Sequence, residues 1–187
     1  TKAQSYTFDK IPTREGEANL SVRQTIQDKN GFLWLATFSG LFRYEGDDYI
    51  IQQTFGDQNE INTDVTSLLQ DKLSNIWIGT NNGLSKYNPI NGKLITYFYS
   101  PENSASIGSN KIRSLGMDHQ GRILIGTFDA GLYAYDANTD GFYKIEFSIS
   151  DLNPPVNIRS ILTEDNGKVW IGTFNEGLWI WDLHKTA

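Results

Sequence analysis

The stretch NIWIGTNNGL, residues 75–84, joins a short apolar run to Gly-Thr and to a polar turn that ends in Gly-Leu. The apolar run is too short for a buried helix. The same pattern occurs three more times, as FLWLATFSGL at 32–41, RILIGTFDAGL at 122–132 and KVWIGTFNEGL at 168–178. Successive copies are 43, 47 and 46 residues apart, counted between their threonines. A fixed period of about 40–50 residues predicts a repeat architecture.

Each repeat contains four short runs of apolar or alternating residues separated by turn residues, and none has a helical period. In the second repeat these runs are Val65–Gln70, the core around Trp77, GLSKY from Gly83 and KLITYF from Lys93. The core run is apolar at three consecutive positions, so its strand must be covered on both faces. Four-stranded antiparallel sheets with this requirement stack radially as the blades of a β-propeller. A solenoid is the alternative, but solenoid strands usually repeat at about 20–30 residues.

We therefore predict one all-β domain over residues 1–187, a β-propeller with four four-stranded blades per chain. The repeats span approximately 22–64, 65–111, 112–157 and 158–187. The fourth repeat lacks a fourth run, and the strand-like segment SYTFDKI at 5–11 is predicted to supply it and to close the ring. Closure of this kind removes open sheet edges. An eight-bladed ring of two chains and a piece of a longer propeller are the alternatives, and the sequence does not choose among the three.

The position before each repeated threonine holds a residue with a minimal side chain. These residues are Ala36, Gly79, Gly126 and Gly172. Glycine in a strand permits close approach of another backbone. We therefore expect these positions to face the crowded centre of the molecule.

The composition excludes several classes of function. A formal net charge of −6 argues against nucleic acid as a partner, because nucleic-acid binding needs clustered Lys and Arg. The chain has no cysteine, which excludes disulfides, thiolate chemistry and cysteine-based metal sites. Residues 136–141, DANTDG, match the first half of a calcium loop, but Phe147 stands where the bidentate Glu should be. A turn is the better interpretation, and neither a metal nor a cofactor is predicted.

The pattern V-x-x-hydrophobic-x-x-D, followed by G-x-hydrophobic-W-hydrophobic-G-T and G-L-x-x-Y, resembles the two-component regulator propeller repeat. Residues 7–49 are especially similar to the first repeat of such a region. The resemblance covers nearly the whole chain, but Leu124 replaces the Trp, Glu164 replaces the Asp and Ser74 replaces the turn Gly. Repeats of this family form periplasmic sensor regions of bacterial hybrid histidine kinases and of some diguanylate cyclases.

The resemblance implies a non-enzymatic, extracytoplasmic sensor or ligand-binding propeller of a bacterial signal-transduction protein. It implies a periplasmic location within a membrane-anchored protein, with contact to the membrane only through segments outside this sequence. The expected partner is a small molecule, for example an oligosaccharide, or another protein domain, and a homodimer is one of the open alternatives. The other functions to be considered are a structural or protein-interaction propeller without a small ligand and a propeller lyase or hydrolase.

Arginine follows the first β-branched residue of the first run in three repeats, at Arg23, Arg113 and Arg159, whereas the second repeat has Thr66. The first strand of a propeller blade is innermost, so these side chains are predicted to point toward one mouth of the central channel. Guanidinium groups there would bind a carboxylate, phosphate or sulfate bidentately. The alternative is that each arginine pairs with a loop acid, such as Asp64, Asp129 or Glu176, and only fixes adjacent blades.

The turns after the repeated threonines are predicted to share a face with the longest loops, 56–64, 100–111 and 148–157, which are polar. Loops of this kind usually carry binding residues. Aromatic rings with Asn, Asp and Glu around them suit a sugar, because a flat apolar platform is then surrounded by orienting polar groups. The ligand-binding candidates in these turns are Phe38, Asn82, Phe128, Asp129, Phe174, Asn175 and Glu176. Alternatively, the rings pack between blades.

A propeller lyase would need a histidine beside the channel to act as a general base. The two histidines of the chain are His119, in a turn of the third repeat, and His184, near the C-terminal end of the sequence. Both positions are predicted to be exposed and to lie in elements away from the channel. No catalytic residue is therefore predicted, and the chain is expected not to be an enzyme.

Overall fold

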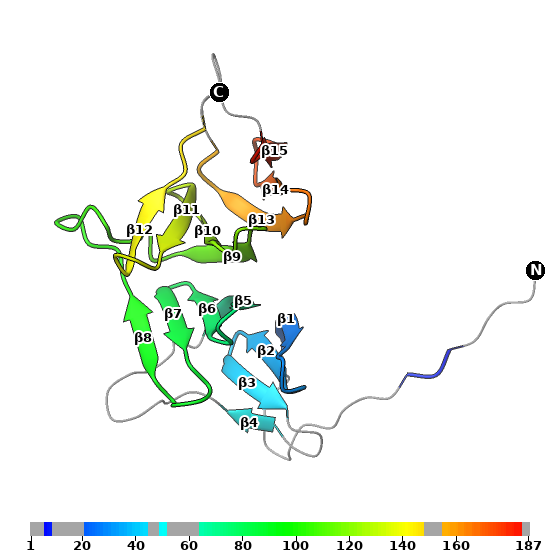
Figure 1. Ribbon diagram of the computed structural model, residues 1–187. Helices are drawn as coiled ribbons and strands as arrows, with labels where there is room; N and C mark the ends of the chain where they lie inside the picture. Colours follow the sequence, from blue (N-terminus) through cyan, green and yellow to red (C-terminus); the bar gives the residue numbers. More distant parts are fainter. Residues whose placement is uncertain (1–5, 9–20, 45–48, 52–63, 148–154, 185–187) are drawn as a thin grey trace, which may run out of the picture.

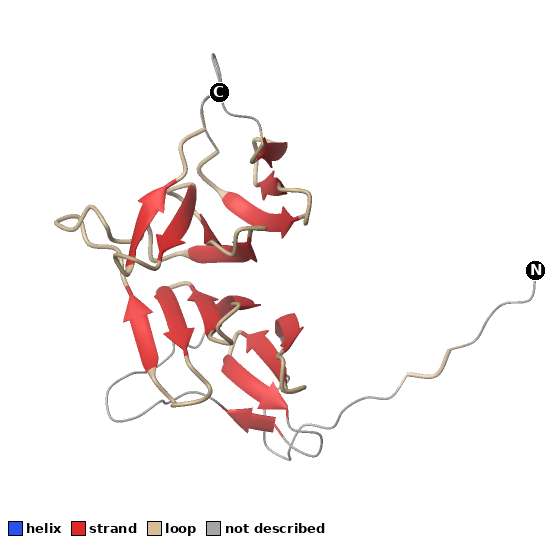
Figure 2. Cartoon of the chain, in the orientation of Figure 1, coloured by secondary structure: helices blue, strands red, loops and turns tan. Residues whose placement is uncertain are grey.

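The structure is a computed structural model of the 187-residue chain that describes residues 6–8, 21–44, 49–51, 64–147 and 155–184. These residues form strands, turns and loops, and none of them is in a helix (Figure 2). The strands make up four antiparallel sheets, one for each sequence repeat. The prediction of an all-β fold is confirmed.

Within each sheet, the strands follow one another in chain order, and each pairs with the next. The first sheet contains β1 (Val22–Gln27), β2 (Leu33–Thr37), β3 (Gly40–Tyr44) and β4 (Tyr49–Ile51). The second contains β5 (Val65–Gln70), β6 (Ile76–Thr80), β7 (Gly83–Tyr87) and β8 (Leu94–Tyr97). The third contains β9 (Ile112–Met117), β10 (Ile123–Thr127), β11 (Leu132–Asp136) and β12 (Gly141–Lys144). Among the described residues, the fourth contains β13 (Ile158–Thr163), β14 (Lys168–Thr173) and β15 (Leu178–Asp182).

The four sheets follow one another around an arc, with the first strand of each sheet on the inner side (Figure 1). Strand β1 packs against β5, β5 against β9, and β9 against β13. Sheets stacked face to face around an axis in this way are the blades of a β-propeller. We therefore call the sheets blades 1 to 4. Three of them have the predicted four strands.

An acidic side chain organises the turn between the first two strands of a blade. In blade 2, Asp71 Oδ1 accepts hydrogen bonds from the backbone N–H groups of Leu73 and Asn75. Its other oxygen accepts a hydrogen bond of 2.9 Å from Nε1 of Trp77. Asp28 makes the same set of bonds in blade 1. The repeated Asp and Trp therefore form one unit that satisfies the polar atoms of a buried turn.

The two departures from this pair are accommodated locally. In blade 4, Glu164 takes the place of the aspartate and accepts a hydrogen bond of 2.5 Å from Nε1 of Trp170. In blade 3, where Leu124 replaces the tryptophan, Asp118 binds Nε of Arg122 at 2.6 Å instead. The substitutions at these positions therefore leave no buried carboxylate oxygen of the turn without a donor.

Each of the first three blades buries one face against the next blade. In blade 2 this face carries Trp77 and Leu84, which form one hydrophobic cluster with Ile112, Ile123 and Ile125 of blade 3. Strands β6 and β10 are buried at every position. The prediction that the core strand is covered on both faces is correct for these two blades.

In blades 2 and 3, the glycine before the repeated threonine faces the next blade. A Cβ atom at Gly79 would lie only 2.7 Å from Cγ2 of Ile112, the first residue of β9. At Gly126 the corresponding distance, to Cγ2 of Ile158 in β13, would be 2.5 Å. Real side chains do not approach so closely, so glycine permits the observed spacing of blades 2, 3 and 4 near the axis.

The corresponding face of blade 4 is exposed. Leu162, Leu178 and Ile180 are 63%, 68% and 50% exposed. Of the predicted closing strand at 5–11, only residues 6–8 are described, and they belong to no strand. Closure of the ring by this segment stays a prediction. In the part of the chain that is described, no helix has the length and apolar character needed to cross a membrane.

Candidate functional site

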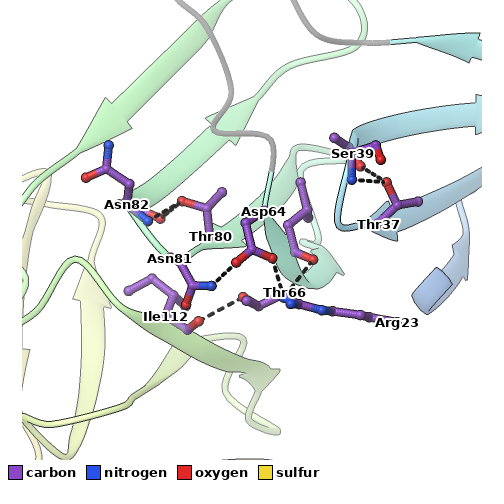
Figure 3. Close-up of polar contacts among 12 residues, drawn as sticks. Arg23, Thr37, Ser39, Asp64, Thr66, Thr80, Asn81, Asn82 and Ile112 are labelled. Atoms are coloured by element: carbon purple, nitrogen blue, oxygen red, sulfur yellow. Dashed lines mark hydrogen bonds and ion pairs between the residues drawn. The ribbon is translucent and has the colours of Figure 1, made fainter. Parts of the chain in front are cut away.

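The turn after the second strand is held in the same way in every blade. In blade 2, Thr80 Oγ1 donates a hydrogen bond of 2.9 Å to the carbonyl of Gly83 and accepts one of 3.0 Å from the Asn82 N–H (Figure 3). The threonines of the other blades make the same two bonds. Short hydroxyl side chains commonly stabilise turns in this way. The repeated threonine therefore fixes the turn that carries most of the candidate residues.

These turns lie at the same end of the blades as the loops that lead into the next blade. The N–H of Gly83 donates to the Asn110 carbonyl at 2.7 Å, and the N–H of Gly131 donates to the Val156 carbonyl at 2.9 Å. The described ends of the loops that precede β9 and β13 therefore contact the turns, as propeller geometry predicts. Residues 56–63 and 148–154 of the predicted loops lie outside the described residues.

A β-bulge near the start of each first strand sets the direction of one side chain. In β1 the pairing register shifts between Val22 and Gln24, so the residue between them has no partner on β2. The residues at this position of the four blades are Arg23, Thr66, Arg113 and Arg159. A bulge interrupts the regular alternation of a strand and re-aims a side chain. The three candidate arginines are thus presented by one repeated backbone feature.

Arg23 and Thr66 use this position to hold the next blade (Figure 3). Nη1 of Arg23 lies 2.7 Å from Asp64, which precedes β5, and the guanidinium lies 3.6 Å from the ring centre of Phe38. Thr66 Oγ1 donates a hydrogen bond of 2.8 Å to the carbonyl of Ile112. For Arg23 the structure therefore agrees with the alternative prediction, in which the arginine pairs with a loop acid.

Arg113 and Arg159 instead gather around Phe128. Their guanidinium carbons lie 4.9 Å and 5.9 Å from the centre of this ring, and Arg159 lies 4.6 Å from the ring centre of Phe174. Neither arginine forms an ion pair with any described residue. Burial, together with the positive charges of Arg159 and Arg23, lowers the pKa of the Arg113 guanidinium.

Asp129 binds a lysine that the sequence analysis did not single out. Lys111 Nζ lies 3.2 Å from Asp129 Oδ2 and 5.3 Å from the ring centre of Phe128. Lys111 directly precedes β9, just as Asp64 directly precedes β5. A charged residue at this position of two repeats was the available sequence signal. The lysine adds a third cation around Phe128.

The remaining candidates are less involved with the arginines. Asn81, rather than the predicted Asn82, points to Asp64 and donates a side-chain hydrogen bond to it, whereas the Asn82 side chain points away (Figure 3). In blade 4, the Asn175 N–H donates to Glu176 within their own exposed turn. The structure thus groups Arg113, Arg159, Phe128, Phe174 and Asp129, with Arg23 and Phe38 paired in blade 1.

A cleft of about 510 Å³ lies between blades 2 and 3 at the other end of the strands, where the turns after β5 and β9 line it. Its polar side chains largely bind one another. Lys86 Nζ donates to the hydroxyl of Tyr135 at 3.2 Å and lies 5.2 Å from the ring centre of Trp77, and both carboxylate oxygens of Asp71 accept hydrogen bonds from the turn. Few groups in the cleft are left to recognise a ligand, so it is the weaker candidate site.

A polar cluster joins the outer strands of blades 2 and 3. The hydroxyls of Tyr97 and Tyr135 both donate to Asp140 Oδ1 at 2.6 Å. Partial burial disfavours the charged form of Asp140, but the two hydrogen bonds and the charge of Lys86 outweigh it, so the pKa of this carboxyl is lowered. Burial and the hydrogen bond to Asp140 raise the pKa of the Tyr97 hydroxyl. The cluster therefore favours an ionised Asp140 beside neutral Tyr97.

The two histidines lie side by side, with their ring centres 5.6 Å apart. His119 follows the end of β9, whereas Arg113 is near its start, so about 20 Å of strand separates the histidine pair from the arginines. Both histidines are exposed. Nothing in the sequence pattern indicated that these two residues meet, because the contact depends on how blades 3 and 4 pack.

The predicted family resemblance is confirmed by comparison with known proteins. Residues 59–82 match the family described as two component regulator propeller. Among solved structures, the extracellular domain of the hybrid two component system BT3049 from B. thetaiotaomicron is 28% identical, with a TM-score of 0.77 over 89% of this chain and 24% of that one. The extracellular domain of the hybrid two component system BT4673 from the same organism is 27% identical, with a TM-score of 0.72 over 93% of this chain and 23% of that one.

The chain thus spans about a quarter of the length of these two sensor domains. A virginiamycin B lyase from Staphylococcus aureus is 8% identical, with a TM-score of 0.59 over 93% of this chain and 59% of that one. That likeness concerns the fold alone. No curated protein sequence matches the chain. The WD40 β-propeller domain of Doa1 is 16% identical, with a TM-score of 0.65 over 90% of this chain and 53% of that one, and it supports the β-propeller fold.

Proposed function

We propose that the chain is part of the extracytoplasmic sensor region of a bacterial signal-transduction protein and that it binds a ligand without catalysing a reaction. Its similarity to two extracellular domains of two-component systems supports this role. The same similarity supports a periplasmic location in a membrane-anchored protein. In this proposal, ligand binding changes the position of the blades relative to the rest of the protein. This change in position is then transmitted to an output domain.

The proposed site is the end of the blades that carries the bulged arginines and the threonine-held turns. One observation carries the proposal: Arg113 and Arg159, from different blades, meet at Phe128 and have no carboxylate partner among the described residues. Phe174 lies beside Arg159 and is 59% exposed, so part of its ring is available to a ligand. Aromatic platforms with polar groups around them favour a small molecule such as an oligosaccharide.

The lyase alternative is less favourable because the histidines lie at the far end of β9 from this site. A general base must come within hydrogen-bond reach of the proton that it removes. A protein-interaction propeller without a small ligand is the second alternative. The lyase alternative predicts turnover of a bound compound, and the protein-interaction alternative predicts that no small molecule binds.

The test is isothermal titration of the purified chain with a panel of neutral and acidic oligosaccharides. At least one compound is expected to bind and to raise the melting temperature, because a ligand of the native state stabilises it. Phe174→Ala should weaken this binding. The matched control is Tyr143→Ala, which removes a comparably exposed ring at the other end of the blades and should leave binding unchanged.

Failure of every compound to bind would favour a protein partner instead. Equal loss of binding in the two ring variants would place the site elsewhere. Turnover of a bound compound that is lost in His119→Ala or His184→Ala would support the enzyme alternative.

A further inference from the structure

We propose that the ligand of this face carries an oxyanion, a carboxylate or sulfate group, which Arg113 and Arg159 bind together beside the Phe128 ring. The inference rests on the proposed function for the location of the site. It adds the chemical class of the group that is recognised and the two residues that recognise it.

The four cations at this end of the molecule are unevenly neutralised. Arg23 is held by Asp64 at 2.7 Å, and Lys111 is held by Asp129 at 3.2 Å. No described carboxylate lies within ion-pair distance of Arg113 or Arg159. Asp64 and Asp129 attract Arg113 only from beyond ion-pair distance, so the positive charge without a direct acidic partner is confined to two neighbouring bulges, on β9 and β13.

One of the two arginines also has a hydrogen-bond donor without a partner. Nε of Arg113 is buried and has no hydrogen-bond partner among the described residues. Leaving a buried donor unpaired is unfavourable, and a charged donor is worse than a neutral one. Because Nε is covered and Arg113 as a whole is half-buried, a ligand would bind the remaining donors of the same guanidinium, and its negative charge would offset part of this cost. A guanidinium presents its donors as a planar fork that matches the two oxygens of a carboxylate or the oxygens of a sulfate.

The cations that surround Phe128 also repel one another. The guanidinium groups of Arg113 and Arg159 approach the same ring, at 4.9 Å and 5.9 Å from its centre, and Lys111 approaches it at 5.3 Å. Burial and the charges of Arg159 and Arg23 disfavour the charged form of Arg113 more than the carboxylates of Asp64 and Asp129 favour it, so its pKa is lowered. Contact with an aromatic face offsets only part of such a cost. A bound anion would relieve both the repulsion and the desolvation.

The charge of the chain and the exposed ring beside the arginines favour a small ligand that bears a single anionic group. The net charge of the chain is −6, so a polyanion such as nucleic acid would be repelled by most of the surface. A single oxyanion on a small molecule needs only the local charge. The exposed ring of Phe174, 4.6 Å from Arg159, provides an apolar platform next to the charge. An acidic saccharide has both the anionic group and the flat ring that this arrangement fits.

The test compares glucuronate with glucose by isothermal titration, and inorganic sulfate by thermal shift, on the purified chain. Glucuronate should bind more tightly than glucose, and sulfate should raise the melting temperature. Arg113→Ala and Arg159→Ala should each weaken glucuronate binding about tenfold or more, the effect expected when a charge-assisted hydrogen bond is lost. Glucose binding should change little.

The matched control is Lys72→Ala, which removes one positive charge at the opposite end of the blades. It should leave the affinity for glucuronate within a factor of two, whereas an effect of the net charge of the chain alone would lower it as much as the arginine variants do. Arg113→Lys is the second control for folding. It keeps the charge but not the planar fork, so it should still weaken glucuronate binding.

Equal affinity for glucose and glucuronate would overturn this inference and leave the proposed function standing. Anion binding that survives in the Arg113→Ala, Arg159→Ala double variant would overturn it as well. Absence of any response to glucuronate and sulfate would also contradict it, while the oligosaccharide panel would still decide the proposed function.

Discussion

Leu84 and Leu178 occupy the same position of the repeat, at the start of the third strand in blades 2 and 4, yet Leu84 is fully buried and Leu178 is 68% exposed. The surrounding repeat positions are alike, since both blades have a tryptophan, a glycine and a threonine in the preceding strand. The difference lies in the neighbour. Blade 3 covers this face of blade 2, and no described residue of the chain covers it on blade 4.

The comparison teaches that burial in this molecule is supplied between blades rather than within them. A single sheet has two apolar faces and cannot cover either of them itself. The tryptophan–carboxylate turn and the threonine-held turn, by contrast, form in blade 4 as they do in blade 2. Local hydrogen bonding therefore follows from the repeat sequence, and the hydrophobic contribution depends on which blade is next.

The largest difference in stability is expected between the variants that truncate these two leucines. Leu84→Ala should lower the free energy of unfolding by about 2–5 kcal/mol, because it leaves a cavity in the cluster between blades 2 and 3. Leu178→Ala should change it by less than about 0.5 kcal/mol, because the side chain is mostly in water already. Urea unfolding followed by tryptophan fluorescence measures both. Comparable losses in the two variants would mean that this face of blade 4 is covered in solution, either by closure of the ring within the chain or by a second copy of the chain.

The next effect is expected at the glycines beside the repeated threonine. Gly79→Ala would bring a methyl group to 2.7 Å from Ile112 of the next blade and should cost about 1–3 kcal/mol of unfolding free energy. A Cβ atom at Gly172 would approach only Ser160 of its own blade closely, so Gly172→Ala should cost clearly less unfolding free energy. Both variants disturb the equivalent serine of their own blade, so the difference between them reports the contact between blades. Equal losses would assign the whole effect to that serine.

A pH-dependent effect is expected at the cluster that joins blades 2 and 3. The folded-state pKa of Asp140 is lowered from its ordinary value of 3.8, so its stabilising contribution is present above pH 3.8 and is lost as the pH falls through the folded-state pKa. Asp140→Asn should therefore make unfolding less sensitive to pH below about pH 3.8. Asp165→Asn, in an exposed turn of blade 4, should keep the wild-type dependence. An unchanged slope in Asp140→Asn would exclude this linkage.

The smallest effect is expected in a turn that does not depend on the neighbouring blade. Ser74 has a φ of 68°, in the region that favours glycine, and the same turn position in blade 1 is Gly31 with a φ of 90°. Ser74→Gly should raise the melting temperature through a gain of about 0.5–1 kcal/mol, and Gly31→Ser should lower it by a similar amount. Both changes should be of similar size despite the different blades. A destabilising Ser74→Gly would mean that the serine hydroxyl has a role in the turn.

Much of the fold could be predicted because each repeat encodes its own sheet. The predicted runs at Val65–Gln70 and around Trp77 are strands β5 and β6, and the repeated threonine lies where each turn begins. Period-two alternation, turn residues and the 40–50-residue repeat depend on neighbours close in sequence. The match to the repeat family over residues 59–82 follows from the same local pattern.

The candidate site could be predicted only in part. Sequence spacing indicated three equivalent arginines, and the bulge in each first strand does present them alike. It offered pairing with a loop acid such as Asp64 for all three arginines alike, and it did not indicate that only Arg23 would form such an ion pair with a described acid. Nor did it place Lys111 beside Phe128. Ion pairing is decided by distances between blades, and these have no counterpart in a single repeat.

By itself, the sequence determined the secondary structure, the number of repeats and the hydrogen bonds within each turn, because these arise between residues close together in the chain. Only the tertiary structure decided which leucines are buried, which arginines keep unpaired charge and that His119 meets His184. Those outcomes depend on contacts between sheets, and the free energies of hydrophobic burial and of charge pairing are set by surroundings that packing creates.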